Sequence, residues 1–200
     1  MSTLATTNLK NASSGSNNIV LATDGSTTIT TLSGTTITGT SVRGAITSGT
    51  AVASTSGTSI DFTGIPSWVK RVTVMFNGVG TSSTSEKLLQ LGNSGGIETT
   101  GYASSATTDA SRFATSTSGF VLSHAFNSSN AETMLGAIVL TNVASNSWVA
   151  QGAFHTPTYT TGNFVAGGKA LSGTLDRVRI TTVNGTDTFD AGSINILYEG

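Results

Sequence analysis

The chain has 200 residues, of which 10 % are charged, and its formal net charge is −1. Its nine basic residues are spread along the chain, which argues against a nucleic-acid partner, because binding phosphates needs clustered Lys and Arg. The absence of cysteine excludes disulfides, zinc fingers and thiol chemistry.

Small polar residues dominate the composition. The chain contains 28 Ser, 37 Thr and 24 Gly but only 2 Pro. Thr favours strands, whereas Ser and Gly favour turns. Disordered chains usually combine low hydrophobicity with high net charge, whereas here 36 % of the residues are hydrophobic and the net charge is close to zero. The composition therefore predicts a folded, all-β protein.

No window approaches the 18 apolar residues of a membrane-spanning helix, so we expect no membrane insertion. The opening sequence, MSTLATTNLK, lacks the regions of a signal peptide. The sequence therefore predicts that the protein stays in the cytoplasm where it is made, unless cell lysis or an assembled particle carries it out.

Residues 1–49 form the first predicted region. They contain three charges, at Lys10, Asp24 and Arg43, and few aliphatic residues. Within them, Ile19–Leu21 followed by Asp24 and Gly25 predicts a short strand ended by a turn. Such a region cannot offset its own backbone entropy, at roughly 1–2 kcal/mol per residue, by burying apolar surface. It is either a flexible linker or an extended arm that obtains its core from neighbouring copies, and we favour the arm.

The stretch 58–79 divides the chain. No aromatic residue precedes Phe62, and all 13 aromatic residues lie from there onward. From Val69 to Val79 the side chains alternate, which predicts a half-buried strand with Val72, Val74 and Phe76 on one face. The dipeptide Asn77–Gly78 predicts a turn after it.

Residues 50–200 are predicted to form an antiparallel β-sandwich or jelly-roll-like domain. The predicted strands are 50–54, 59–63, 69–78, 87–92, 97–103, 119–123, 135–142, 147–155, 163–170, 173–182 and 190–198.

Several connections within this domain are also predicted. The sequence LGNSGG indicates a turn, and Asn184–Gly185 predicts a hairpin joining the last two strands. Residues 104–118 are predicted to be a long exposed loop, and a short helix is expected near 129–135. Residues 133–168 carry no charge, which indicates central strands or a surface buried against another subunit.

The sequence shows no constellation of catalytic or metal-binding residues. Neither His124 nor His155 has another ligand at metal-binding spacing. Glu98, Asp109 and Asp176 are candidates for a paired-carboxylate glycosidase site, although surface solubility explains them better. The patterns of serine hydrolases and P-loops are missing. We therefore predict a non-enzymatic protein with no catalytic residues, cofactor or metal.

The aromatic residues are either core or sugar-stacking groups. Core packing is the favoured interpretation for Trp68 and Trp148. Tyr102 and Tyr159 lie beside Ser/Thr-rich segments, so they are predicted to be exposed receptor contacts.

Three segments resemble known sequences. They are ATTNLKNASSGSNNIVLATDGSTTI near the start, GTSIDFTGIPSWVKRVTVMFNGV in the middle and DRVRITTVNGTDTFDAGSINILYEG at the end. They resemble segments of small fibre and tail-associated proteins of tailed bacteriophages, especially marine and cyanobacterial ones. The resemblance implies a virion protein, usually trimeric, with an N-terminal attachment region and an outward-facing C-terminal β domain.

Together these observations predict a homotrimeric, tail-fibre-type virion protein that is made in the host cytoplasm and leaves it in the virion. Its arm would contact other virion proteins, and its β domain would meet a host-surface glycan or receptor. The residues expected to face the trimer axis are Ile19, Val20, Leu21, Ile29, Leu32 and Ile37. A capsid decoration or head-fibre protein is the alternative, and a glycan depolymerase is the third.

Overall fold

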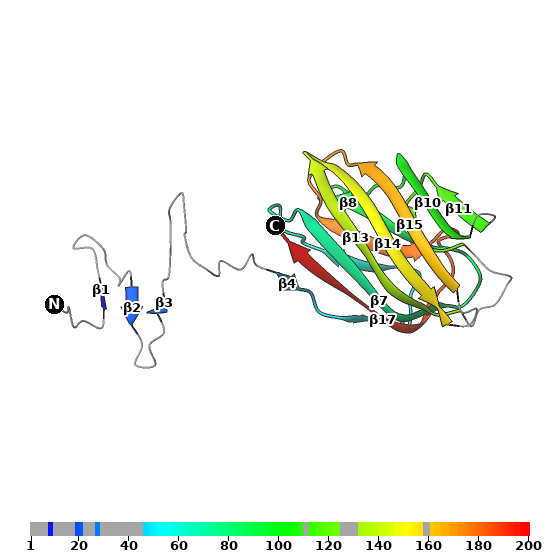
Figure 1. Cartoon of the computed structure of the whole chain (residues 1–200), viewed down its shortest axis with the longest axis horizontal. Coiled ribbons are helices and arrows are strands. Elements are labelled where there is room, and N and C mark those ends of the chain that lie inside the picture. Colours follow the sequence, from blue (N-terminus) through cyan, green and yellow to red (C-terminus); the bar gives the residue numbers. More distant parts are fainter. Residues whose placement is uncertain are drawn as a thin grey trace. The chain divides into compact units, whose positions relative to one another are not determined.

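A computed structural model describes residues 8–9, 19–21, 27–28, 46–109, 112–124, 132–157 and 161–200. The chain divides into two units, residues 1–43 and residues 44–200 (Figure 1). Each unit is considered by itself below.

The described residues of the first unit form three short antiparallel strands. They are β1 (Asn8–Leu9), β2 (Ile19–Leu21) and β3 (Thr27–Thr28), in the order β1-β2-β3. The strand predicted at Ile19–Leu21 is therefore confirmed. Ile29, Leu32 and Ile37 lie outside the described residues. That these six aliphatic residues face a trimer axis stays a prediction.

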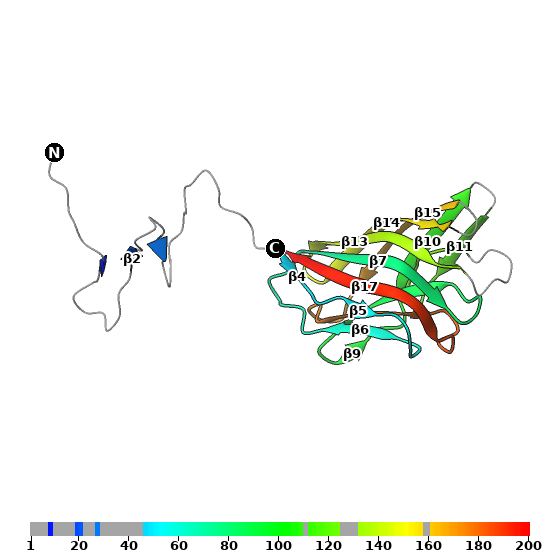
Figure 2. The same cartoon turned by 90° about the horizontal axis from the view of Figure 1, so that it is seen from below.

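The second unit is all-β and consists of two antiparallel sheets. The large sheet has the strand order β11-β10-β15-β14-β13-β7-β17-β4, and β5 also pairs with β17. The small sheet has the order β12-β8-β16-β6, and β9 pairs with β8. Figure 2 shows β13, β7 and β17 in one layer and β6 and β9 in the other.

The strand bounds follow the predicted ones closely in most cases. The large sheet comprises β4 (Thr47–Ser48), β5 (Val52–Ala53), β7 (Arg71–Thr81), β10 (Tyr102–Asp109), β11 (Arg112–Ser116), β13 (Met134–Ala144), β14 (Ser147–Thr156), β15 (Thr161–Ala170) and β17 (Phe189–Glu199). The small sheet comprises β6 (Ile60–Thr63), β8 (Lys87–Asn93), β9 (Gly96–Ile97), β12 (Phe120–Val121) and β16 (Arg177–Thr182).

The core lies between the sheets and follows from side-chain alternation. On β7, Val72, Val74 and Phe76 are buried as predicted. The ring of Phe76 packs edge-on against the ring of Phe154 on β14, with 5.3 Å between the ring centres. On the small sheet, Val178 and Ile180 of β16 belong to the same buried cluster. Burying each such side chain fully stabilises the fold by roughly 1.5–3 kcal/mol, so this cluster fixes which faces of the sheets point inward.

The uncharged stretch 133–168 forms three central strands of the large sheet, β13, β14 and β15. This confirms the first of the two predictions for that stretch. Their outer faces carry exposed apolar side chains, among them Val149 and Phe164, and the latter is 63 % exposed.

The turn predicted at Asn77–Gly78 is wrong, because β7 runs through both residues to Thr81. The pairing with β17 shifts register at this point. Gly78 has a φ of +67° and Gly192 on β17 has a φ of +88°. A Cβ at Gly192 would lie 2.3 Å from the carbonyl oxygen of Gly78, so glycine permits a bulge in place of a turn.

The exposed loop predicted for residues 104–118 is also wrong. Strands β10 and β11 occupy most of it and pair with each other, and β10 also pairs with β15. Ser104 and Ala106 point into the core, and the Ser104 hydroxyl accepts a hydrogen bond from the Val121 amide at 2.9 Å. Because these inward-facing side chains are short, the sequence lacks the alternation of large apolar and polar residues that identifies a strand.

The predicted final hairpin does not form. Strand β16 pairs with β8 and β6 in the small sheet, whereas β17 pairs with β7, β4 and β5 in the large sheet. The turn at Asn184–Gly185 therefore connects the two sheets. By contrast, the turn in LGNSGG is confirmed, because Asn93 on β8 pairs with Gly96 on β9.

Smaller corrections concern the ends of elements. Residues 98–101 are not a strand, and β16 begins at Arg177, later than predicted. The helix expected near 129–135 extends into residues outside the description, but Met134 and Leu135 belong to β13. Strand β4 pairs with β17, so the β domain begins before residue 50.

Candidate functional site

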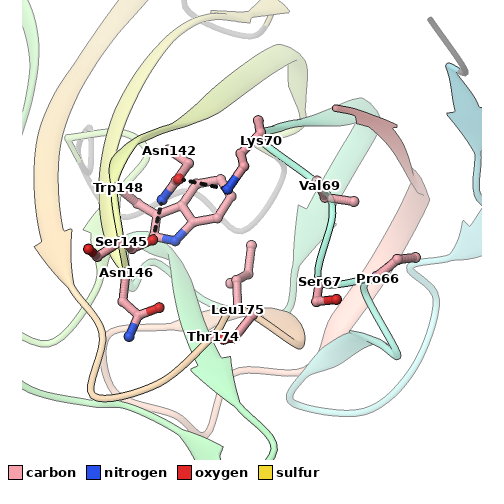
Figure 3. Close-up of a pocket in the computed structure, with 10 residues that line it drawn as sticks. All are labelled: Pro66, Ser67, Val69, Lys70, Asn142, Ser145, Asn146, Trp148, Thr174 and Leu175. Carbon is pink, nitrogen blue, oxygen red and sulfur yellow. Dashed lines mark hydrogen bonds between the residues drawn. The ribbon is translucent and has the colours of Figure 1, made fainter. Parts of the chain in front are cut away.

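A small polar pocket lies where the β13–β14 turn meets the segment before β7 (Figure 3). Its volume is about 100 Å³. The residues that line it are Pro66, Ser67, Val69, Lys70, Asn142, Ser145, Asn146, Trp148, Thr174 and Leu175. We call it the Trp148 pocket.

The wall of the Trp148 pocket is held by Asn142. The Asn142 side chain donates from Nδ2 to the carbonyl oxygens of Ser145 at 2.9 Å and Ser147 at 3.2 Å. Its Oδ1 faces Lys70 Nζ at 3.4 Å. Ser145, with a φ of 47°, is the only described residue other than glycine in the left-handed region. Such strained positions persist where the surroundings hold them, and they cluster at functional sites.

Trp148 itself is 4 % exposed, as the core prediction required. Its Nε1 is buried and has no hydrogen-bond acceptor among the described residues. Figure 3 shows the nitrogen edge of the indole turned toward the space beside Asn146 and Leu175. A buried N–H without a partner is uncommon, because leaving it unpaired costs about 1–3 kcal/mol.

A wider groove adjoins the Trp148 pocket and shares Ser67, Thr174 and Leu175 with it. The groove has a volume of about 620 Å³. Its other lining residues include Asn93, Ser94, Ser172 and Asp176. Hydroxyl and amide groups thus alternate with aliphatic surface, which suits ligands that carry many hydroxyls.

Glu98 stands behind the groove and is fully engaged. Its Oε1 accepts hydrogen bonds from Asn93 Nδ2 at 2.9 Å, Ser172 N at 2.8 Å and Ser172 Oγ at 2.7 Å. Its Oε2 pairs with Lys169 Nζ at 2.5 Å, and this nitrogen lies 5.3 Å from the centre of the Tyr102 ring. We call these residues the Glu98 cluster.

The pKa of Glu98 reflects these contacts. Burial by itself would raise it, but the hydrogen bonds from Lys169 and Ser172 and the charge of Lys169 together bring the pKa below its usual value. The carboxylate is therefore held ionised.

The structure describes the side chains of two of the candidate glycosidase carboxylates, Glu98 and Asp176. Glu98 is bound to Lys169, and Asp176 pairs with Arg177 at 2.7 Å. The side chain of Asp109 lies outside the description. Glu98 and Asp176 thus each have a basic side chain as their ion-pair partner.

The prediction of an exposed Tyr102 is wrong, because this side chain is only 3 % exposed. Its hydroxyl accepts from the Leu91 amide at 2.7 Å and donates to the Glu98 carbonyl at 3.0 Å. Burial raises the pKa of Tyr102, although the hydrogen bond from Leu91 opposes the shift. Tyr159, the other predicted contact, lies outside the described residues.

The core prediction for Trp68 is wrong in turn, because Trp68 is 45 % exposed. It directly follows Ser67, which lines both the Trp148 pocket and the groove. Sequence reasoning thus singled out four aromatic residues and assigned Tyr102 and Trp68 to the wrong environments. It also missed the polar residues of the pocket, because Asn and Ser occur throughout the chain and gave no distinguishing signal.

Across the described ranges, no group of three or more His, Asp or Glu residues is placed to hold a metal ion. Nor does that part of the chain contain a helix long and apolar enough to cross a membrane.

The chain matches no protein-family model, and comparison with curated proteins and with solved structures gives no match either.

Proposed function

We propose that this protein is a bacteriophage virion structural protein, a trimeric fibre of the tail-fibre type. Its N-terminal region attaches it to other virion proteins, and its β-sandwich domain meets a glycan or receptor on the host surface. The observation that carries the proposal is the contrast between a Ser/Thr/Gly-rich region without aromatic residues and a β domain with a polar groove. The resemblance to segments of phage fibre proteins implies that the first region is for attachment and that the β domain faces outward.

The outer face of the large sheet supports assembly from identical copies. The stretch 133–168 has no charge, and Val149 and Phe164 on its strands are exposed. Burying an uncharged face against another copy removes no charge from water and sets no like charges against each other, so such a face favours contact between copies. The same property suits a capsid decoration protein, which packs in many copies, and this is our second candidate.

A glycan depolymerase receives no comparable support. Hydrolysis of a glycosidic bond needs two carboxyl groups on either side of the sugar, at most about 9.5 Å apart. Glu98 and Asp176 are each bound to a cation, and we propose no hydrolytic role for them.

The test compares the full chain with a fragment of residues 44–200, which keeps the pairing of β4 and β5 with β17. We expect the full chain to be trimeric by light scattering and to join phage particles, and the fragment to stay folded without joining them. Normal incorporation of the fragment would overturn the attachment role. The copy number per particle separates the candidates: few copies indicate a tail fibre, and hundreds indicate a decoration protein.

A further inference from the structure

The Trp148 pocket contains a hydrogen-bond donor that the fold does not use. Trp148 Nε1 is buried without an acceptor in the part of the chain that the structure describes. The Asn142 amide, which lines the same pocket, already donates to Ser145 and Ser147, so it is not available to turn around and accept from the indole. The indole N–H is therefore a donor in a residue of the pocket wall that no described residue uses.

Lys70 adds a positive charge at the rim of the same pocket. None of the ion pairs found among the described residues includes Lys70. Its ammonium group instead faces Asn142 Oδ1 at the long distance of 3.4 Å. Two acids lie nearby: the Lys70 amide donates to the Glu199 carbonyl at 2.8 Å, and Asp176 lines the adjoining groove. Both side chains are already paired, Glu199 with Arg71 and Asp176 with Arg177. The charge on Lys70 is thus not neutralised by the described part of the chain.

From these two donors we infer that the Trp148 pocket binds the carboxylate of an acidic sugar. One carboxylate oxygen accepts from Trp148 Nε1, and Lys70 Nζ neutralises the group. A neutral hydroxyl would satisfy the indole but leave the lysine charge unmatched. This inference rests on the proposed role in host-surface attachment and names the class of glycan that the site takes.

The dimensions agree with this assignment. The Trp148 pocket, at about 100 Å³, is much smaller than the groove and suits a group the size of a carboxylate. The ring then lies in the adjoining groove of about 620 Å³. There its hydroxyls meet the polar side chains of Ser67, Ser94 and Ser172.

The experiment follows the indole N–H signals of the full-length protein, labelled with ¹⁵N-tryptophan, during titration with D-glucuronate and separately with D-glucose. The chain has two tryptophans, and Trp68→Phe assigns the two signals. We expect glucuronate to shift the Trp148 signal in a saturable way. Glucose should bind at least about tenfold more weakly, because it lacks the carboxylate that accepts the charge-assisted hydrogen bond.

Two charge-removing variants locate the effect. Lys70→Gln should weaken glucuronate binding by about tenfold or more without changing the response to glucose. Arg71→Gln is the matched control, because it removes a neighbouring positive charge on β7 that is paired with Glu199 and does not line the pocket. It should bind as the unaltered chain does.

Equal responses to glucose and glucuronate, or equal losses in both variants, would overturn the carboxylate assignment. A Trp148 signal that responds to neither sugar would overturn the pocket as a site for acidic sugars altogether. Both results would leave the fibre proposal standing, because that proposal is tested by particle incorporation. Conversely, a fragment that joins particles normally would overturn the attachment role but would not change the result expected from the sugar titration.

Discussion

The Glu98 cluster and the Trp148 pocket both adjoin one groove, yet they differ in how their polar groups are paired. In the Glu98 cluster, the carboxylate accepts from Asn93, Ser172 and Lys169. In the Trp148 pocket, the indole N–H has no acceptor among the described residues.

This difference separates a structural role from a binding role. A network whose donors and acceptors are all paired gains nothing from a ligand, and it stabilises one arrangement of the groove wall. A buried donor left unpaired lowers stability by itself, and a ligand oxygen repays that loss on binding. Substitution of Glu98 should therefore lower the stability of the fold strongly, whereas removal of the indole N–H of Trp148 should lower it little.

The largest effect is expected for Glu98→Ala. It leaves the Lys169 ammonium, whose side chain is only 6 % exposed, without its counter-charge. Removing one partner of a buried pair costs about 3–5 kcal/mol of unfolding free energy. Denaturant unfolding measures the loss, and Lys70→Ala, at an exposed position, serves as the control. A loss below about 1 kcal/mol would contradict a structural role for the cluster.

A smaller effect comes from pH acting on the same carboxylate. Since contacts with Lys169 and Ser172 bring the pKa of Glu98 below its ordinary value of 4.5 in spite of burial, the folded state favours the ionised form. The stabilisation is fully present above pH 4.5 and is lost as the pH falls through the lowered pKa. We expect the stability gap between the unaltered chain and Glu98→Gln to narrow on acidification. A gap that stays constant or widens toward low pH would contradict this.

Trp148→Phe should change stability little. The ring still fills most of the volume while the unpaired N–H disappears, so we expect a change within about 1 kcal/mol of the unaltered chain. Trp148→Ala is the contrasting variant, which opens a cavity and should lose about 3–5 kcal/mol. A loss of more than about 2 kcal/mol of unfolding free energy in Trp148→Phe would indicate that the indole N–H has a partner within the fold. The contrast between the Trp148 pocket and the Glu98 cluster would then be wrong.

The smallest effect is expected for Ser145→Gly at the β13–β14 turn. A φ of 47° is strained for serine and relaxed for glycine. Because glycine also raises the entropy of the unfolded chain, the net gain should be only about 0.5 kcal/mol, measurable as a rise in denaturation midpoint. Asn146→Gly, at a position without positive φ, should destabilise instead.

Local patterns in the sequence determined the fold class and most strand positions. Period-two alternation over Val72, Val74 and Phe76 identifies β7, because each of these side chains is large enough to mark a buried face. Glycine and asparagine in LGNSGG likewise identify the turn between β8 and β9, because the turn geometry depends on those residues alone. The absence of charge from 133 to 168 marked the centre of the large sheet.

Only the tertiary structure decided which partner each strand has and which polar group remains unpaired. The turn at Asn184–Gly185 has the same local chemistry whether the next strand joins the same sheet or crosses to the other. Tyr102 faces inward because Leu91 and Glu98, brought together by strand pairing, satisfy its hydroxyl. The unpaired N–H of Trp148 depends on where Asn142 and Ser145 end up in space, which no spacing of residues along the chain encodes.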